Sequence, residues 1–418
     1  MRPRRFNSIS LVASCLLLVQ HGHSSAQSSY TAVVFSQTNV SVLSGFGCSF
    51  GQYVGTSYDG TSRAILWSGS FSNALILGPS GTDESFAFGV SDGQQIGYFL
   101  SAFGAHAALW NGTAESMVDL DPGAFGGSVA SAVHNGVQVG YGSGVRHALL
   151  WRGSAASVID LHPTNANPMI QPYYETFATC VAGRFQGGYG TKSDSPRALM
   201  WTGTRQSVIE LSSGASKVAG ISCSGTAVGF VFNSTTTIHA TMWHGNATSF
   251  VDLNPTGFAS SQANAISGNV QVGSGARTNQ PTTALVWFGT PESVIELQQF
   301  LPPEFVRSEA MAIDEFGNIL GHASRTDATT AAILWVPEVV SGSAPTLKIA
   351  PWCEAGGKVK LQIRGEAGRT YGIQKSSDLL SWTTVMSTNF PTFLFYFQDL
   401  EATNSQTGFY RAFLSNQP

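Results

Sequence analysis

Charged side chains are scarce in this chain, and their scarcity excludes one class of partner. Asp, Glu, Lys and Arg make up 11% of the 418 residues and leave a net charge of −4, whereas typical soluble domains carry about 25% charged residues. No run of Lys or Arg follows Arg5. Because phosphate groups are bound by clustered basic side chains, we expect no nucleic-acid partner.

Long apolar runs are also missing, apart from one near the start. Basic residues at Arg2–Arg5 precede the apolar run Ile9–Val19 and the small residues Ser24–Ala26, which is the pattern of a secretory signal peptide over residues 1–26. The run is shorter than the roughly 20 residues of a membrane-spanning helix. A bacterial lipobox at Val12–Cys15 is the alternative. We therefore expect a protein that is secreted, extracellular, or held in the periplasm or at the cell surface, without a transmembrane segment.

Cysteine is rare too, and its spacing argues against a metal site. After the predicted signal peptide the chain keeps Cys48, Cys180, Cys223 and Cys353, and none has the spacing of metal ligands. Export permits disulfides. A bridge between Cys180 and Cys223 and buried free thiols are both open. We expect no metal and no cofactor.

A tandem repeat marked by tryptophan dominates what the chain does contain. Seven tryptophans recur every 41 to 50 residues, each closing an Ala-x-x-Trp block: Trp67, Trp110, Trp151, Trp201, Trp243, Trp287 and Trp335. In the first six repeats Gly stands at Trp+2 and Leu at Trp+10. A repeat of this length cannot bury its own apolar face, so successive repeats must stack. We place the recurring Trp in the core between them.

Each repeat has the pattern of four short antiparallel strands. In repeat three the strand His147–Trp151 turns and returns as Ser157–Leu161, and two more strands, Ser128–Val133 and Val137–Gly140, lie upstream. Four strands in about 44 residues match the blade of a β-propeller. We therefore predict an all-β fold with a seven-bladed β-propeller over residues 27–337. An open β-solenoid is the alternative.

The two ends of the repeat array complement each other. Repeat seven stops before its fourth strand, while an orphan strand, Thr31–Phe35, precedes repeat one. Phe35 precedes Gly55 by 20 residues, and the same spacing separates the repeat leucine Leu120 from Gly140. We predict that the orphan strand completes the seventh blade and closes the ring, with Phe35 in the leucine position.

The Ala-Leu-Leu-Trp block after a Val-Gly strand resembles the HAF repeat family of extracellular bacterial proteins. The resemblance covers roughly Ser44 to Val336. It implies export and repetition, and it brings no catalytic residues.

Polar side chains recur at Trp−4 and Trp+9, which the hairpin places nearly opposite each other. The pairs are His106 with Asp119, His147 with Asp160, Arg197 with Glu210, and His239 with Asp252. They have the chemistry of general bases or metal ligands. However, a catalytic site occurs once in a protein, whereas these pairs recur on blades that cannot converge. We interpret them as structural clasps, by analogy with WD-repeat propellers.

Two connections depart from the repeat, and we predict a ligand-binding surface on them because loops vary at little cost. The connection after Leu161 is nine residues longer than its neighbours, and the one after Leu297 is four longer. The predicted ligand-binding residues are Met169, Gln171, Tyr173, Tyr174 and Glu175 in the first, and Phe300, Phe305 and Arg307 in the second. Loops that merely pack over the ring are the alternative.

Enzyme motifs are missing from the sequence. It has no Gly-x-Ser-x-Gly elbow, no His-Glu-x-x-His, no phosphate-binding glycine loop and no EF-hand. We predict a monomeric, non-catalytic scaffold that binds a polysaccharide or another extracellular protein. The alternative is a glycoside hydrolase or lyase whose carboxylates meet across the ring. Asp59, Asp92, Asp194 and Glu309 are available for it, and nothing in their spacing selects among them.

The pattern changes after the last repeat. Residues 338–345 have the composition of a linker, and Lys358–Ile363 alternates between polar and apolar residues as a strand does. We predict a β-sandwich over residues 346–418. Segments Gly368–Thr383 and Phe409–Ala412 resemble an accessory β-sandwich domain of secreted Planctomycetes and Verrucomicrobia proteins. That resemblance implies a location outside the cytoplasm and no chemistry.

Overall fold

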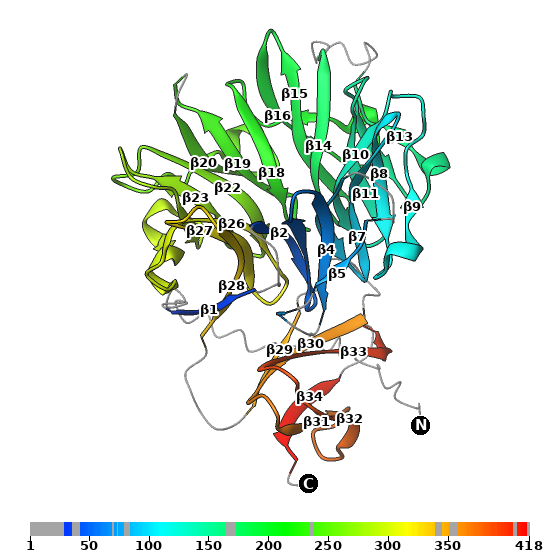
Figure 1. The fold of residues 1–418 in the computed structure, drawn as a ribbon, viewed down its shortest axis with the longest axis vertical. Helices are drawn as coiled ribbons and strands as arrows, with labels where there is room; N and C mark the ends of the chain where they lie inside the picture. Colours follow the sequence, from blue (N-terminus) through cyan, green and yellow to red (C-terminus); the bar gives the residue numbers. More distant parts are fainter. Residues whose placement is uncertain are drawn as a thin grey trace, which may run out of the picture.

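The computed structural model shows an all-β chain (Figure 1). The structure describes residues 29–35, 42–68, 71–72, 74–78, 84–163, 173–234, 237–338, 345–350, 358–403 and 408–415. Within these ranges the only helices are short 3-10 turns, and none is long and apolar enough to cross a membrane. The predicted signal peptide lies outside the described residues.

Repeats two to six each form one four-stranded antiparallel sheet, in which the spatial order of the strands follows the chain. The strands are β6 (Ser85–Ser91), β7 (Gln94–Ser101), β8 (Gly104–Trp110) and β9 (Val118–Asp119); β10 (Ser128–His134), β11 (Val137–Gly142), β12 (Ala148–Trp151) and β13 (Ile159–Asp160); β14 (Glu175–Ala182), β15 (Phe185–Lys192), β16 (Ser195–Trp201) and β17 (Ile209–Glu210); β18 (Ser216–Ile221), β19 (Thr226–Phe232), β20 (Ile238–His244) and β21 (Val251–Asp252); β22 (Ser260–Ser267), β23 (Val270–Ala276), β24 (Thr283–Trp287) and β25 (Ile295–Glu296).

Repeats one and seven form one eight-stranded sheet, which a single parallel bridge between Val42 and Thr330 joins. Its strands are β2 (Val42–Ser49), β3 (Gln52–Tyr58), β4 (Ser62–Ser68) and β5 (Leu75–Ile76) from repeat one, and β26 (Phe305–Ile313), β27 (Ile319–Arg325) and β28 (Thr330–Pro337) from repeat seven, together with β1 (Tyr30–Val34). The first strands of successive sheets contact one another all round, including β2 with β26, so they are the innermost strands of a propeller-like ring (Figure 1).

The N-terminal strand completes the sheet of repeat seven, as predicted. β1 pairs with β28 in antiparallel register, with Tyr30 opposite Pro337. The Phe35 amide donates to the Ala332 carbonyl at 2.9 Å, which is the bond that the leucines of repeats one to five make to the alanine at Trp−3. Phe35 is 2% exposed. Phe35 therefore occupies the leucine position, and the pairing of β1 with β28 joins the two ends of the repeat array.

Seven glycines of the second strands are required by close backbone approach. They are Gly55, Gly97, Gly140, Gly188, Gly229, Gly273 and Gly321. A Cβ at any of them would lie 1.8–2.0 Å from a carbonyl oxygen of the inner strand. Each inner strand has a β-bulge directly after this point. The bulge and the glycine together let the two strands cross closely beside the axis.

The repeated tryptophans form the core between sheets. All seven are 0% exposed. Trp151, for example, clusters with Leu109 and Leu120 of the preceding sheet and with Leu149 of its own. The prediction that Trp packs between stacked repeats is confirmed, and burial of this much aromatic surface at each step stabilises the stack.

The outer strands are shorter than predicted. In repeat three the return strand predicted over Ser157–Leu161 is only β13, and the 3-10 turn η2 (Ala155–Ser157) precedes it. Ser157 Oγ accepts from the Arg152 amide at 2.8 Å and donates to the Ser154 carbonyl at 2.6 Å. Equivalent turns recur as η1 (Ala114–Ser116), η3 (Arg205–Ser207), η4 (Ala247–Ser249) and η5 (Pro291–Ser293), and η6 (Leu297–Phe300) opens the last connection. The serine therefore competes with strand pairing at this point.

The C-terminal residues form two three-stranded sheets, β29-β30-β33 and β32-β31-β34, at one end of the ring (Figure 1). Their strands are β29 (Thr346–Ile349), β30 (Lys358–Arg364), β31 (Thr370–Ser376), β32 (Thr383–Asn389), β33 (Leu394–Thr403) and β34 (Phe409–Leu414). One hydrophobic cluster includes Leu361 and Ile363 of β30 and Tyr371 and Ile373 of β31. The two sheets thus share a core.

Two of the described cysteines are free thiols and a third is in a disulfide. Cys48 and Cys180 are buried free thiols, and burial raises the pKa of Cys180 to about 12. Cys223 is disulfide-bonded. Because Cys180 is free, the bridge between Cys180 and Cys223 that the sequence left open is excluded. Cys353 lies outside the described residues.

A buried polar cluster joins the ring to the C-terminal sheets. The Tyr396 hydroxyl lies 3.1 Å from the Tyr53 hydroxyl and accepts from Asn318 Nδ2 at 3.2 Å. Asp314, 2% exposed, accepts from the amides of Phe316 and Asn318 at 2.8 and 2.9 Å. Burial, with Glu315 nearby, raises the pKa of Asp314 to about 7.

This cluster predicts a loss of stability as the pH rises from acidic to neutral. A carboxyl whose pKa is raised on folding binds a proton more tightly in the folded state, so its contribution is complete below its ordinary pKa and is lost as pH rises towards 7. We expect the melting temperature to fall between pH 5 and about pH 8, and Asp314→Asn to flatten that fall. Thermal melts of both proteins across this range measure it. An unchanged slope in the variant would contradict the assignment.

Candidate functional site

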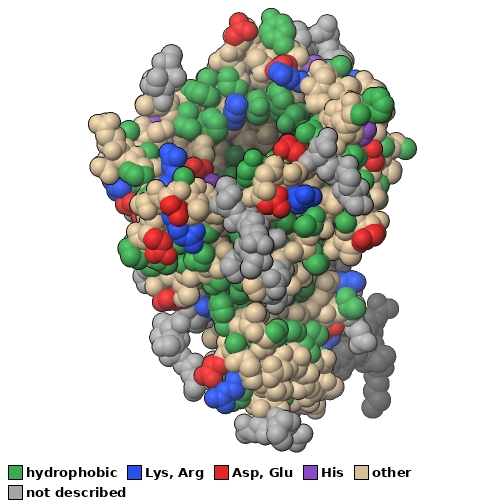
Figure 2. Space-filling model, in the orientation of Figure 1, with side chains coloured by type: hydrophobic (Ala, Val, Ile, Leu, Met, Phe, Trp, Pro, Cys, Tyr) green, Lys and Arg blue, Asp and Glu red, His purple; other side chains and the backbone are tan. Residues whose placement is uncertain are grey.

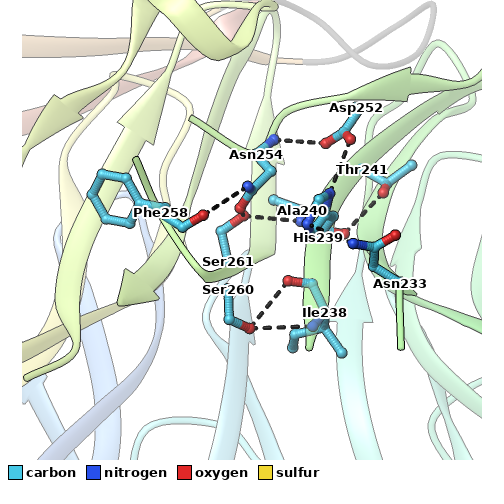
Figure 3. Close-up of polar contacts among 10 residues, drawn as sticks. All are labelled: Asn233, Ile238, His239, Ala240, Thr241, Asp252, Asn254, Phe258, Ser260 and Ser261. Carbon is cyan, nitrogen blue, oxygen red and sulfur yellow. Dashed lines mark hydrogen bonds and ion pairs between the residues drawn. The ribbon is translucent and has the colours of Figure 1, made fainter. Parts of the chain in front are cut away.

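The predicted clasps exist, and each is part of a longer chain of hydrogen bonds (Figure 3). In repeat five His239 Nδ1 lies 3.0 Å from Asp252 Oδ2, and Asp252 Oδ1 accepts from the Asn254 amide at 2.8 Å. Ser261 Oγ donates to Asn254 Oδ1 at 2.6 Å and accepts from the Ala240 amide at 3.1 Å. Since Ser261 belongs to β22, the chain bonds one sheet to the next.

The same chain recurs in other repeats. His106 Nδ1 lies 2.8 Å from Asp119 Oδ2, and His147 Nδ1 lies 3.0 Å from Asp160 Oδ2. Thr176 takes the place of Ser261 in repeat three, accepting from the Ala148 amide at 2.9 Å. The inner-strand Ser or Thr was not predicted, although the hydroxyl residue recurs at one register position in the sequence.

Repeat four departs from this scheme. Arg197 Nε is 3.9 Å from Glu210 Oε1, a looser ion pair than the histidine clasps. The Tyr173 hydroxyl donates to Glu210 Oε2 at 2.5 Å. Among the described residues no group of three or more His, Cys, Asp or Glu could hold a metal ion. The histidine clasps connect one sheet to the inner strand of the next through hydrogen bonds, which is the geometry of a brace.

A double-mutant cycle tests the brace. His147 and Asp160 are both half-buried, so we expect His147→Ala and Asp160→Ala each to lower the free energy of unfolding by roughly 1–3 kcal/mol. Asp160→Ala should cost more, because Asp160 Oδ1 also accepts from the His162 amide at 2.8 Å. The double variant should lose less than the sum. Additive losses in denaturant melts would show that the two side chains do not act together.

A second recurring pair stands near the end at which the chain enters each inner strand. One member of the pair lies on the inner strand, two positions before the bulge. The other lies on the second strand, directly after the recurring glycine of that strand, and the two residues are opposite each other in the sheet. The seven cross-strand pairs are Ser44 with Thr56, Phe86 with Tyr98, Val129 with Tyr141, Phe177 with Tyr189, Lys217 with Phe230, Gln262 with Ser274, and Glu309 with His322. We call these fourteen residues the axial positions.

Aromatic side chains on one side of the ring form a surface that we call the axial aromatic arc, namely Phe46, Phe86, Phe88, Tyr98, Tyr141, Phe177 and Tyr189. In one group of rings Phe86 stacks on Tyr98 at 4.7 Å, and Phe88 lies 5.7 Å from Phe46. In the other, Phe177 stacks on Tyr189 at 4.7 Å and meets Tyr141 at 5.0 Å. All seven are only half-buried.

The arc is open to solvent. Figure 2 shows a hollow in the face of the ring with hydrophobic side chains gathered round it. The C-terminal sheets contact Gly51, Asp92 and Asn318, which lie in turns at the opposite end of the inner strands. The described residues of the C-terminal sheets therefore contact the ring at the end away from the arc. Burial raises the pKa values of Tyr98, Tyr141 and Tyr189, so their hydroxyls stay protonated donors.

The other side of the ring is polar. Glu309 stands opposite His322, whose ring lies 6.3 Å from that of Phe46. Burial lowers the pKa of His322, which keeps its ring neutral. Glu309 is the one carboxylate among the fourteen axial positions. The sequence had named it as one of four carboxylates without selecting it.

Comparisons with known proteins found only solved structures of low sequence identity and low TM-score. No protein-family model matches this chain. No curated protein matches it either. The chain is similar to a crystal structure of TolB from Acinetobacter baumannii, at 10% identity over 59% of this chain and 64% of that chain with a TM-score of 0.37. It is also similar to a crystal structure of puromycin hydrolase, at 10% identity over 81% of this chain and 59% of that chain with a TM-score of 0.48.

A third similar structure is an exo-beta-1,3-galactanase from Phanerochaete chrysosporium with galactose, at 8% identity over 93% of this chain and 96% of that chain with a TM-score of 0.24. The chain spans about six-tenths of the length of the first two structures, 64% and 59%. At these identities each similarity concerns the fold alone.

The predicted ligand-binding residues of the first long connection differ in their exposure to solvent. Tyr173 is 4% exposed and lies against Gly190, so the prediction that it contacts a ligand is corrected: it is a core residue. Tyr174 is 74% exposed, and Glu175 accepts from Arg146 Nη1 at 2.8 Å. Met169 and Gln171 lie outside the described residues.

The second connection is mostly structural. Phe305 is 3% exposed beneath the Arg325 guanidinium, 4.3 Å from its ring, so its predicted ligand contact is also corrected. Phe300 packs against Tyr30 at 5.8 Å. Arg307 is exposed and, with Tyr174, stays a prediction. The arc was missed, although the residue after each second-strand glycine can be aligned from the sequence.

Proposed function

We propose that this chain is an exported seven-bladed β-propeller with a C-terminal β-sandwich, and that it binds a carbohydrate chain at the axial aromatic arc without cleaving it. Five four-stranded sheets and the two halves of the eight-stranded sheet supply the blades. The N-terminal strand supplies the last strand of blade seven. The repeat resemblance and the predicted signal peptide support export.

The observation that carries the proposal is the two groups of touching, partly exposed rings on the first and second strands of neighbouring sheets. A soluble protein seldom leaves contiguous aromatic surface open unless something covers it in use. Sugar rings have apolar C–H faces that pack on aromatic rings, and hydroxyls that bond to polar neighbours. Tyr98, Tyr141 and Tyr189 supply both an apolar face and a phenolic donor. An extended glycan therefore fits the arc.

Binding is favoured over cleavage because the axial positions lack a second carboxylate. Glycoside hydrolysis uses two carboxyl groups about 5–10 Å apart. Glu309 is the one carboxylate among the fourteen axial positions, and Glu175 at the rim is bonded to Arg146. A glycan-cleaving enzyme stays the alternative that the experiment must exclude.

A glycan array followed by calorimetry tests the proposal. We expect a bound polysaccharide whose affinity falls at least tenfold, about 1.4 kcal/mol, in a Tyr141→Ala, Tyr189→Ala variant. Phe250→Ala is the matched control, because Phe250 is 47% exposed and lies outside the arc. Melting temperatures of both variants check that the ring is intact.

Three outcomes would contradict it. An equal loss of affinity in the arc variant and in the control would show that the glycan does not bind at the arc. Release of oligosaccharides in a parallel assay would establish the enzyme. If the folded protein binds no glycan but binds another protein, the ligand is a protein and not a carbohydrate.

A further inference from the structure

One basic side chain, Lys217, stands at a repeat position where the other repeats have no basic residue. Lys217 stands on β18 opposite Phe230, at the axial position that the other repeats fill with Ser, Phe, Val, Gln or Glu. None of those is basic. The stacking of sheets therefore does not depend on a positive charge there, and the lysine is specific to this side of the ring.

Lys217 is an uncompensated charge against an aromatic surface. Its Nζ lies 4.1 Å from the ring centroid of Tyr189, and the side chain is half-buried. Among the described residues no carboxylate lies within 4.0 Å of it. Burial lowers the pKa of Lys217. The ring face offsets only part of that cost.

The surrounding charges leave a positive site at this end of the arc. Arg146 is the other cation near Tyr189, and its bond to Glu175 at 2.8 Å cancels its charge. Glu84 lies near Tyr98, two repeats away from Tyr189 along the arc. An anionic group on a bound ligand is therefore attracted to Lys217 and repelled from the other end, which also sets the direction of the ligand.

Resting on the proposed function, we infer that the bound carbohydrate is acidic, with the carboxylate of a uronic acid residue paired to Lys217 Nζ at the Tyr189 end of the arc. A carboxylate on the pyranose ring projects from the edge of its apolar face. Phe177 and Lys217 Nζ both lie against the Tyr189 ring, at 4.7 and 4.1 Å from its centroid, so the carboxylate meets the ammonium at the edge of the aromatic surface. The charged pair would form on a surface that is already partly desolvated, where it is strongest.

Titration calorimetry with two probes of the same backbone tests the inference. Polygalacturonate carries the carboxylates, and its fully methyl-esterified form does not. We expect the full-length protein to bind the acid form at least tenfold more tightly, with the difference shrinking as salt rises. Lys217→Met should abolish that preference, and Lys217→Arg should keep it. Lys358→Met, an exposed lysine of the C-terminal sheets, is the control.

The outcomes separate this inference from the proposed function. Equal affinity for both probes, or a preference that survives in Lys217→Met with an unchanged melting temperature, would overturn the uronate assignment and leave glycan binding at the arc standing. Binding of neutral array glycans but not of polygalacturonate would do the same. A chain that binds no glycan at all would remove both proposals.

Discussion

Deletion of residues 29–35 is expected to unfold the whole ring rather than to fray one edge. These residues contain β1, whose five register pairs with β28 complete the last sheet. Removing them exposes the edge of β28 and leaves the cavity of Phe35, which packs on Trp67 at 4.9 Å and on Tyr53 at 5.4 Å. Each sheet is stabilised by two neighbours, so an open ring loses an interface as well as a strand.

A point variant gives the scale of this effect. We expect Phe35→Ala to cost about 3–5 kcal/mol, as for other buried aromatic side chains, and the deletion to cost more. Thr31→Ala on the same strand is the control, because the Thr31 side chain is exposed and bonds to Glu338 at the surface. Circular dichroism melts report the loss. A deletion variant that keeps one cooperative transition near the original temperature would show that the ring does not need this strand.

Gly140→Ala is expected to have the second large effect. An added Cβ would lie 1.9 Å from the Val129 carbonyl oxygen and 2.9 Å from Ala130 Cα. Both obstacles are backbone atoms in paired strands, so neither can turn away as a side chain does. Overpacking costs about 1–3 kcal/mol where side chains give way. We expect at least the upper end here, together with lower soluble yield.

The matched control is Gly214→Ala. Only Ser212 Oγ lies near its added Cβ, at 3.8 Å, and its backbone is outside the left-handed region. Loss of one flexible residue in the unfolded chain should leave this variant neutral or slightly more stable. Denaturant melts compare the two. Similar midpoints for both variants would mean that the two strands can separate at Gly140 without cost.

Most of the fold could be predicted from the spacing of the repeats. The register of Trp, Gly and Leu predicted which residues would be buried, and the 20-residue spacing from Phe35 to Gly55 predicted a strand far from its partner in the chain. The clasps could be predicted because a hairpin brings Trp−4 opposite Trp+9 by local geometry. These features depend on contacts within a repeat or between identical neighbours.

The long connections were harder to interpret. Tyr173 was predicted to face a ligand because it lies in an insertion rich in polar residues and proline. In the structure it fills the space above Gly190 and bonds to Glu210, a residue 37 positions away. Composition distinguishes a loop from a strand, but burial of one loop side chain depends on which partner the fold places beneath it.

The period of the repeats, the residues of each core and the clasp within each hairpin follow from the order of amino acids, because their physical causes lie within about one repeat. The arc does not. Phe46 and Tyr189 are 143 residues apart in the chain and belong to one surface only because the sheets stack round an axis and bring their inner strands together. Stacking of consecutive sheets also places Lys217 against the ring of Tyr189. Proximity across blades is a property of the closed ring, and the site is built from it.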